Sequence, residues 1–114
     1  MDIGVIMGPE VFEDKLEHAH DGKNPEATWN TKRLPKGLTP GWTNRLFVAV
    51  SGRWLGYFPL SGEVLWNPED EAAPYALIFD TRGWIPIPRR PVGRFRGWKY
   101  LADAELQADH PRPR

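Results

Sequence analysis

Six tryptophans in 114 residues are the side chains best suited to bind a ligand, because four of them lie beside basic residues. Guanidinium and ammonium groups bind phosphates, and flat indole rings stack on unpaired bases. The pattern therefore favours a nucleic-acid-binding surface. The neighbours are Trp29 with Lys32 and Arg33, Trp54 with Arg53, Trp84 with Arg82, and Trp98 with Arg96 and Lys99.

A second interpretation of the tryptophans is structural. A small β-rich core can be filled by indole rings, with nearby arginines covering them from water. For any single tryptophan this interpretation is the stronger one. Tryptophan is rarely fully buried, however, and a core of this size cannot enclose all six rings. We therefore expect some of them at a binding surface.

Charge is strongly segregated along the chain although the formal net charge is zero. Residues 1–26 hold seven acids and two bases, residues 27–60 five bases and no acid, and residues 61–80 five acids and no base. Six bases and no acid follow in residues 81–102, namely Arg82, Arg89, Arg90, Arg94, Arg96 and Lys99. If the two basic blocks meet, they form a positive surface that attracts polyanions. The alternative is that acidic and basic blocks pair as solvated salt bridges.

Metal and cofactor sites are not indicated. The chain has no cysteine, which excludes disulfides, thiol catalysis and cysteine-bound metal. His18 and His20 lie two residues apart on a predicted helix and point roughly 200° away from each other. His110 lies near the C-terminus. No phosphate-binding loop or dinucleotide fingerprint occurs, so we expect no metal and no cofactor.

Catalytic groups are also sparse. No Gly-x-Ser-x-Gly elbow is present, which argues against a serine triad. Thr31 and Lys32 could converge with Glu26 or Glu63, and they are the only weak catalytic candidates. A set of this kind arises by chance in most chains of this length. The sequence therefore leans away from an enzyme without excluding one.

Length and composition predict a single domain over residues 1–102, followed by a flexible tail at 103–114. Hydrophobic residues make up 40% and charged residues 26%, which is ordinary globular composition. No apolar stretch approaches the length of a membrane span, and residues 1–4 lack a basic leader. These features predict a cytoplasmic protein that does not enter membranes.

The expected elements are one helix and several short strands. Residues 10–20 place Phe12, Leu16 and Ala19 on one helix face, and Gly22 provides a stop. Residues 45–50 are apolar on both faces, which predicts a central strand. The remaining strands are expected at 2–7, 53–58, 63–66, 75–80 and 84–88, with 27–32 a strand or extended loop and 89–100 irregular. Together these elements predict an α+β fold: a small barrel of five or six strands with one N-terminal amphipathic helix.

Three local signals refine this arrangement. Ser51 and Gly52 predict a two-residue turn between strands. Gly56 inside the next strand predicts a bulge or bend. Pro86 and Pro88, two residues apart, remove N–H donors from the same side and predict an edge strand.

The chain resembles the PUA-like superfamily, and within it the ASCH and EVE groups. The resemblance rests on residues 28–33 (TWNTKR) after a strand and helix, on 37–56, and on 88–100 with its Arg-Phe-Arg-Gly-Trp-Lys-Tyr ending. The chain has Gly41-Trp42-Thr43-Asn44 where the family usually has Gly-Asp. Asn30-Thr31-Lys32-Arg33 stands in place of the Gly-Arg-Lys-Thr motif of small ASCH amidohydrolases.

The resemblance implies a β-pseudobarrel that binds RNA, DNA or a modified base in an aromatic-walled cleft between barrel and helix. By motif match, Trp29, Asn30 and Thr31 are the expected wall and hydrogen-bonding groups. By spacing, Trp54 or Trp84 is expected opposite them, and Trp98 is expected to stack a base together with Trp29. Phosphates are expected on Arg89, Arg90, Arg94, Arg96 and Lys99, with Lys32, Arg33 and Arg82 as further basic contacts.

The leading hypothesis is a non-catalytic nucleic-acid-binding domain, with RNA or DNA as its partner. One alternative is a small ASCH-type amidohydrolase acting on a modified nucleoside through Lys32 and Thr31. Another is a protein-interaction or accessory module of mobile-element origin, in which tryptophans form an exposed apolar patch.

Overall fold

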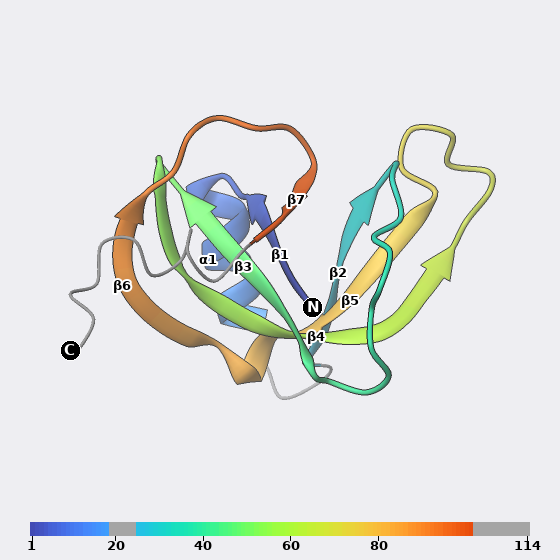
Figure 1. Ribbon diagram of the computed structural model, residues 1–114, viewed down its shortest axis with the longest axis horizontal. Coiled ribbons are helices and arrows are strands. Elements are labelled where there is room, and N and C mark those ends of the chain that lie inside the picture. The colour runs from blue at the N-terminus through green and yellow to red at the C-terminus, as the bar shows by residue number, and fades with distance from the viewer. Residues whose placement is uncertain (19–24, 102–114) are drawn as a thin grey trace.

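The computed structural model describes residues 1–18 and 25–101, which form one α-helix and a seven-stranded mixed sheet (Figure 1). The elements are β1 (Asp2–Ile6), α1 (Pro9–His18), β2 (Glu26–Thr31), β3 (Asn44–Val50), β4 (Arg53–Trp66), β5 (Tyr75–Asp80), the 3-10 helix η1 (Thr81–Gly83), β6 (Ile85–Pro91) and β7 (Trp98–Tyr100). The strand order is β2-β5-β4-β3-β1-β7, and β6 pairs with β4 beside this path. The expected α+β class with one N-terminal helix is confirmed.

The sheet is not closed into a barrel. Within the described residues, β2 pairs with β5 and β7 pairs with β1, and these two strands end the sheet. The sheet curls strongly, so that β2 and β7 both lie near its open mouth (Figure 1). The expected closed barrel of five or six strands is therefore corrected to a curled open sheet of seven strands. We call the gap between β2 and β7 the seam.

Both faces of β3 are buried, which explains its unbroken apolar sequence. Leu46 and Val48 face a core that includes Phe12 of α1, whereas Phe47 and Ala49 face a second cluster. The second cluster is completed by Trp54 and Leu101. The position of β3 between β4 and β1 confirms that residues 45–50 form a central strand.

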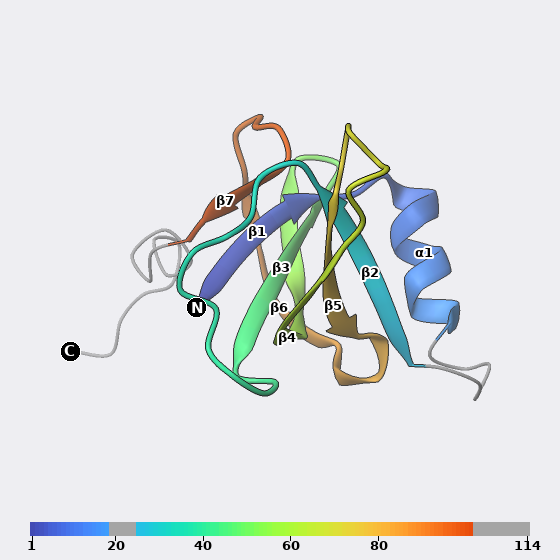
Figure 2. The ribbon, with the colours of Figure 1, turned by 90° about the vertical axis from the view of Figure 1, so that its right-hand side faces the viewer.

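Helix α1 begins at Pro9, where the missing proline N–H costs nothing because the first helical N–H groups lack helical partners. The Gly8 carbonyl accepts a hydrogen bond from the Phe12 N–H at 3.0 Å. The Phe12 ring packs against Trp84 and Phe58, with centroids 4.9 and 6.4 Å away. Figure 2 shows α1 beside β2. The helix thus covers one face of the curled sheet.

Strand β4 is longer than expected and contains the predicted irregularity. It runs through Pro59, where the sequence suggested a break between two strands. Val48 pairs with Gly56 and Ala49 with Trp54, so Leu55 is an extra residue and the bulge is confirmed. The bulge bends β4, which then reaches β3, β5 and β6 along its length.

Strand β6 lies at an edge, as its prolines predict. Among the described residues it pairs with β4 and with no other strand. Strand β7, at residues expected to be irregular, is a finding of the structure. It adds three residues antiparallel to β1, with Val5 opposite Trp98.

An ion pair joins the two parallel strands β1 and β3. Arg45 Nε donates to Asp2 Oδ1 at 2.8 Å, and Nη2 of the same side chain donates to Oδ2. These hydrogen bonds raise the pKa of Arg45 above its ordinary value, although partial burial opposes the shift. The Arg45 side chain stays 41% exposed, so the pair contributes little to stability.

The turn between β3 and β4 gives a prediction about stability. Ser51 and Gly52 have φ angles of 52° and 81°, the left-handed conformation of a two-residue hairpin turn. Asparagine adopts this conformation more readily than serine. We expect Ser51→Asn to raise the free energy of unfolding by about 0.5 kcal/mol. Urea denaturation measures this free energy. A lower stability of the variant would contradict the prediction that serine is the less favourable residue at this position of the turn.

Some sequence predictions fall outside the described residues. They concern His20, Gly22 and the C-terminal segment 103–114 with His110. Within residues 1–18 and 25–101, the helical segments are too short and too polar to span a bilayer.

Candidate functional site

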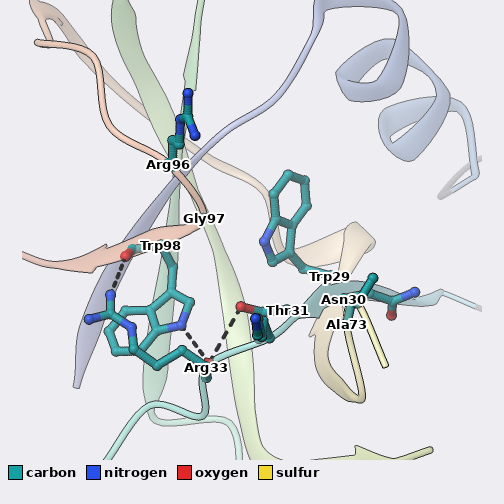
Figure 3. A pocket seen from close by; sticks show the side chains of 10 residues that line it. Trp29, Asn30, Thr31, Arg33, Ala73, Arg96, Gly97 and Trp98 are labelled. Carbon is teal, nitrogen blue, oxygen red and sulfur yellow. Dashed lines mark hydrogen bonds between the residues drawn. The ribbon is translucent and has the colours of Figure 1, made fainter. Parts of the chain in front are cut away.

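A cleft of about 340 Å³ lies at the seam, between the end of β2 and the start of β7. Its first wall comes from β2 and the residues after it, and its second from the residues that enter β7 (Figure 3). The loop between β4 and β5 contributes the rim. The lining residues are Trp29, Asn30, Thr31, Lys32, Arg33, Ala72, Ala73, Arg96, Gly97 and Trp98. We call this hollow the cleft.

Strand alternation orients the β2 side chains. Trp29 and Thr31 face inward and are half-buried and buried, whereas Asn30 and Lys32 are exposed. In Figure 3 the Asn30 side chain points away from Trp98. Pairing with β5 fixes this register, with Trp29 opposite Leu77.

The start of β2 is anchored by η1. The backbone N–H and the hydroxyl of Thr81 both donate to the Pro25 carbonyl, at 2.8 and 2.6 Å. Thr81 is buried, so water competes little for these hydrogen bonds. These hydrogen bonds hold the residue that precedes β2 in place, and pairing with β5 holds Trp29 within the strand.

The indole N–H of Trp29 is buried and has no hydrogen-bond partner within the described part of the chain. Figure 3 shows this nitrogen on the edge of the ring that faces Gly97 and Trp98. An unsatisfied buried donor costs about 1–3 kcal/mol, and such groups are rare in folded proteins. The donor therefore lies buried between the two walls, without an acceptor among the described residues.

Arg33 and Trp98 tie the two walls together. The Arg33 guanidinium lies over the Trp98 ring, 4.0 Å from its centroid, and Nη2 donates to the Trp98 carbonyl at 2.8 Å. In return, Trp98 Nε1 donates to the Arg33 carbonyl at 2.7 Å. The Trp98 ring is therefore buried, and the Arg33 guanidinium covers one of its faces. It cannot stack a base unless Arg33 moves.

A second tie lies further along the seam. The Tyr100 hydroxyl accepts a hydrogen bond from the Lys36 backbone N–H at 2.9 Å and lies 3.3 Å from the Lys36 carbonyl. Residues 32–36, which we call the basic segment, are thus attached to β7 at both ends by side chains. No backbone ladder joins β2 and β7 in the described residues.

Charged residues of both signs surround the cleft. Lys32, Arg33 and Arg96 are exposed and come from the two different basic blocks of the sequence. Glu69 and Glu71 are exposed in the β4–β5 loop, which ends at Tyr75 beside the end of β2. The two basic blocks of the sequence therefore meet here only in part, through Lys32 and Arg33 of the first and Arg96 of the second.

The cleft brings together about half of the residues expected from the sequence. The residues that line it are Trp29, Asn30, Thr31, Lys32, Arg33, Arg96 and Trp98. Arg82, Arg89 and Arg94 are exposed on other parts of the surface and do not line it. The Lys99 ammonium lies over the Phe95 ring, 5.3 Å from its centroid.

Trp54, Trp84 and Arg90 are in the interior instead of the cleft. Trp54 is 1% exposed and fills the second core cluster, and Trp84 packs under Phe12. Arg90 is 2% exposed and is paired with Trp54 across β6 and β4. The expected opposite wall is instead made by Trp98 and its neighbours, because β7 lies across the seam from β2.

Ala72, Ala73 and Gly97 line the cleft and were not anticipated. For Ala72 and Ala73, the sequence contained a pattern that could have predicted their position. A hairpin between strands at 63–66 and 75–80 places its connecting loop beside any strand that pairs with the second of them. No local pattern identified Gly97, because its position depends on β7.

The candidate catalytic set is not assembled. The Thr31 hydroxyl donates to the Arg33 carbonyl at 3.4 Å, and Lys32 is exposed. Glu26 lies at the far end of β2, and Glu63 lies on β4 outside the cleft. The lining residues include no carboxylate, so this geometry offers no acid–base pair. Within residues 1–18 and 25–101, no cluster of three His, Asp or Glu side chains could hold a metal ion.

Helix α1 does not line the cleft, contrary to the expected position between barrel and helix. Comparisons of the chain with protein families, curated proteins and solved structures found no match.

Proposed function

We propose that this protein is a non-catalytic nucleic-acid-binding domain that holds one unstacked base of RNA or DNA in the cleft. The observation that carries the proposal is the buried Trp29 N–H, which lies on the ring edge toward Gly97 and has no acceptor in residues 1–18 and 25–101. Nucleobases carry carbonyl oxygens and ring nitrogens on their edges that accept hydrogen bonds. A base in the cleft would satisfy this donor.

Stacking is available on the opposite wall. The guanidinium of Arg33 is planar, and its central carbon lies 4.0 Å from the centroid of the Trp98 ring. Proteins that bind single strands stack bases on aromatic rings and on guanidinium planes. Arg33 would thus present its outer face to the base, and Trp98 would position Arg33. This differs from the expectation that Trp98 itself stacks the base.

Phosphates would bind at the mouth of the cleft. Lys32, Arg33 and Arg96 are exposed there, and no acid lies among the residues that line the cleft. Arg96 extends away from Thr31, toward the outside, in Figure 3. Cations at the mouth of the cleft would bind the phosphates of a nucleic-acid backbone. The polar and aromatic groups inside the cleft would bind a base that is inserted from that backbone.

The PUA-like resemblance belongs to the same proposal. A curled mixed sheet whose end strands are tied by side chains is compatible with a pseudobarrel of that kind. On this interpretation the seam is the ligand entrance. Residues 28–33, which carry part of the resemblance, supply half of the lining.

Salt dependence tests the proposal. We expect labelled single-stranded RNA or DNA to bind with a slope of log Kobs against log salt of about −2, since three cations would each displace counterions at about −0.7 per phosphate. Affinity then falls about 15-fold between about 50 and about 200 mM salt. Fluorescence anisotropy measures both, with duplexes of the same length for comparison.

Two charge variants provide the control. Replacing Lys32 and Arg96 together by glutamine should reduce the slope to about −0.7. Arg82→Gln removes an equally exposed cation that does not line the cleft and should leave the slope unchanged. Absence of binding by the wild-type protein at low salt, or equal effects of the two variants, would overturn the proposal.

A further inference from the structure

A second hollow of about 400 Å³ lies next to the cleft. Leu34, Pro35 and Leu38 form one side of it, and Val64, Trp66 and Tyr75 form the other. We call it the Trp66 groove. It continues from the cleft because Leu34 follows Arg33 in the chain and Tyr75 is paired with Thr31 across β5 and β2.

Trp66 is exposed to an unusual degree. Its side chain is 68% exposed, the largest value among the large hydrophobic residues that the structure describes. It lies at the end of β4, opposite Tyr75 on β5, and outside both core clusters. The ring therefore contributes little to the core and presents an apolar face beside a hollow.

The basic segment separates the two hollows. Lys32, Arg33 and Lys36 are exposed along it, and Tyr100 and Trp98 hold it against β7. Cations on a fixed ridge between two aromatic hollows suit a sugar–phosphate backbone with a base on each side. The acids Glu69 and Glu71 lie in the β4–β5 loop, between Trp66 and Tyr75, where they would repel a phosphate. Charge thus favours a backbone that follows residues 32–36.

We propose that the Trp66 groove is a second base-binding subsite, so that the ligand is a single strand of two or more nucleotides. This inference rests on the function proposed above. One base enters the cleft, the backbone crosses the basic segment, and the next base stacks on Trp66. Two bases held in separate hollows on either side of a protein segment are unstacked from each other, which a duplex does not permit. The ligand class is therefore single-stranded nucleic acid.

The test compares ligands of two lengths. We would measure the affinity of Trp66→Ala and wild-type protein for nucleoside monophosphates and for a mixed-sequence single strand of about eight nucleotides. Loss of one base–aromatic stack is expected to weaken binding of the strand roughly 10- to 100-fold. Affinity for the monophosphates should not change, because one nucleotide occupies the cleft alone. Trp66→Phe, which keeps a ring, should recover most of the affinity for the strand.

Trp42→Ala is the matched control. Trp42 is also exposed, at 45%, but lines a different hollow with Arg45 and Tyr57. Its replacement should leave the affinity for the strand unchanged. Equal affinities of the Trp66→Ala, Trp42→Ala and wild-type proteins for the strand would overturn the second subsite and leave the groove to another partner, such as a protein. Failure of wild-type protein to bind either ligand would instead overturn the proposed function.

Discussion

Replacing Trp29 by phenylalanine is expected to weaken binding of a single-stranded oligonucleotide about tenfold, while stability changes by less than about 1 kcal/mol. The phenyl ring keeps the apolar wall but has no N–H to donate to the ligand. In the described part of the free protein this N–H has no hydrogen-bond partner, so its removal relieves a desolvation cost. The smaller ring leaves some space unfilled, and these two effects on stability oppose each other.

Trp98→Phe is the matched comparison, because Trp98 lies on the opposite wall and its indole N–H already makes a hydrogen bond within the protein. It donates to the Arg33 carbonyl at 2.7 Å, and the ring supports the Arg33 guanidinium. We expect this variant to lose about 2 kcal/mol of stability. Trp29→Phe should therefore lose affinity with little loss of stability, whereas Trp98→Phe should lose stability and, because Trp98 positions Arg33, affinity as well.

Anisotropy titration and urea denaturation measure these effects. An unchanged affinity of Trp29→Phe would mean that bound water, and not the ligand, satisfies the donor. A large loss of stability in Trp29→Phe would mean that the indole has a structural role equal to that of Trp98. Either result would contradict the role assigned to Trp29.

Gly56→Ala is expected to destabilise the fold by about 3 kcal/mol and to lower the melting temperature by about 12 °C. A Cβ at this position would lie 2.2 Å from the Ile85 carbonyl oxygen and 2.8 Å from Pro86 Cα. Both are backbone atoms of β6, so relief requires β6 to move away from β4. The contact with the Trp84 ring, at 2.7 Å, adds to the clash.

Gly93→Ala is the control for this prediction. No heavy atom lies within 4 Å of a Cβ built at Gly93 in the described structure. Its replacement should change the melting temperature by only a degree or two, roughly, since nothing is displaced. Thermal denaturation followed by circular dichroism compares the two variants. Equal melting temperatures would show that β6 is not packed closely on β4.

Local sequence patterns predicted the central hairpin and the edge strand well. The apolar run before Ser51 and Gly52 specified β3, the turn and the start of β4. The spacing of Pro86 and Pro88 specified an edge. In each case the signal is local, because it depends on side-chain alternation or on a missing N–H.

Other elements depend on distant residues and were not predicted. Strand β4 continues through Pro59 because β3 pairs with it there, which no local rule indicates. Strand β7 has only three residues, and pairing with β1 defines it. Closure of the sheet likewise depends on how far β2 and β7 approach, and this distance is a property of the whole fold.

The site was predicted in part for the same reasons. Trp29, Asn30 and Thr31 were assigned to the first wall through the family resemblance, and all three line the cleft, although the Asn30 side chain points away from Trp98. The second wall was assigned to Trp54 or Trp84, but both are core residues. Arg90 was assigned to phosphate binding, yet β6 packs it inward beside Trp54. A sheet covered on both faces gives no sequence signal that separates buried aromatic residues from exposed ones.

The side-chain ties across the seam have a consequence for which molecules fit. Hydrogen-bonded strands are held at a fixed spacing of about 4.8 Å, which is too close for anything to enter between them. Here Arg33 with Trp98, and Lys36 with Tyr100, set the width of the opening instead. The width of the opening therefore depends on a few side chains that mutation can change. A larger or smaller ligand could be accommodated by substitutions at these positions while the rest of the fold stays the same.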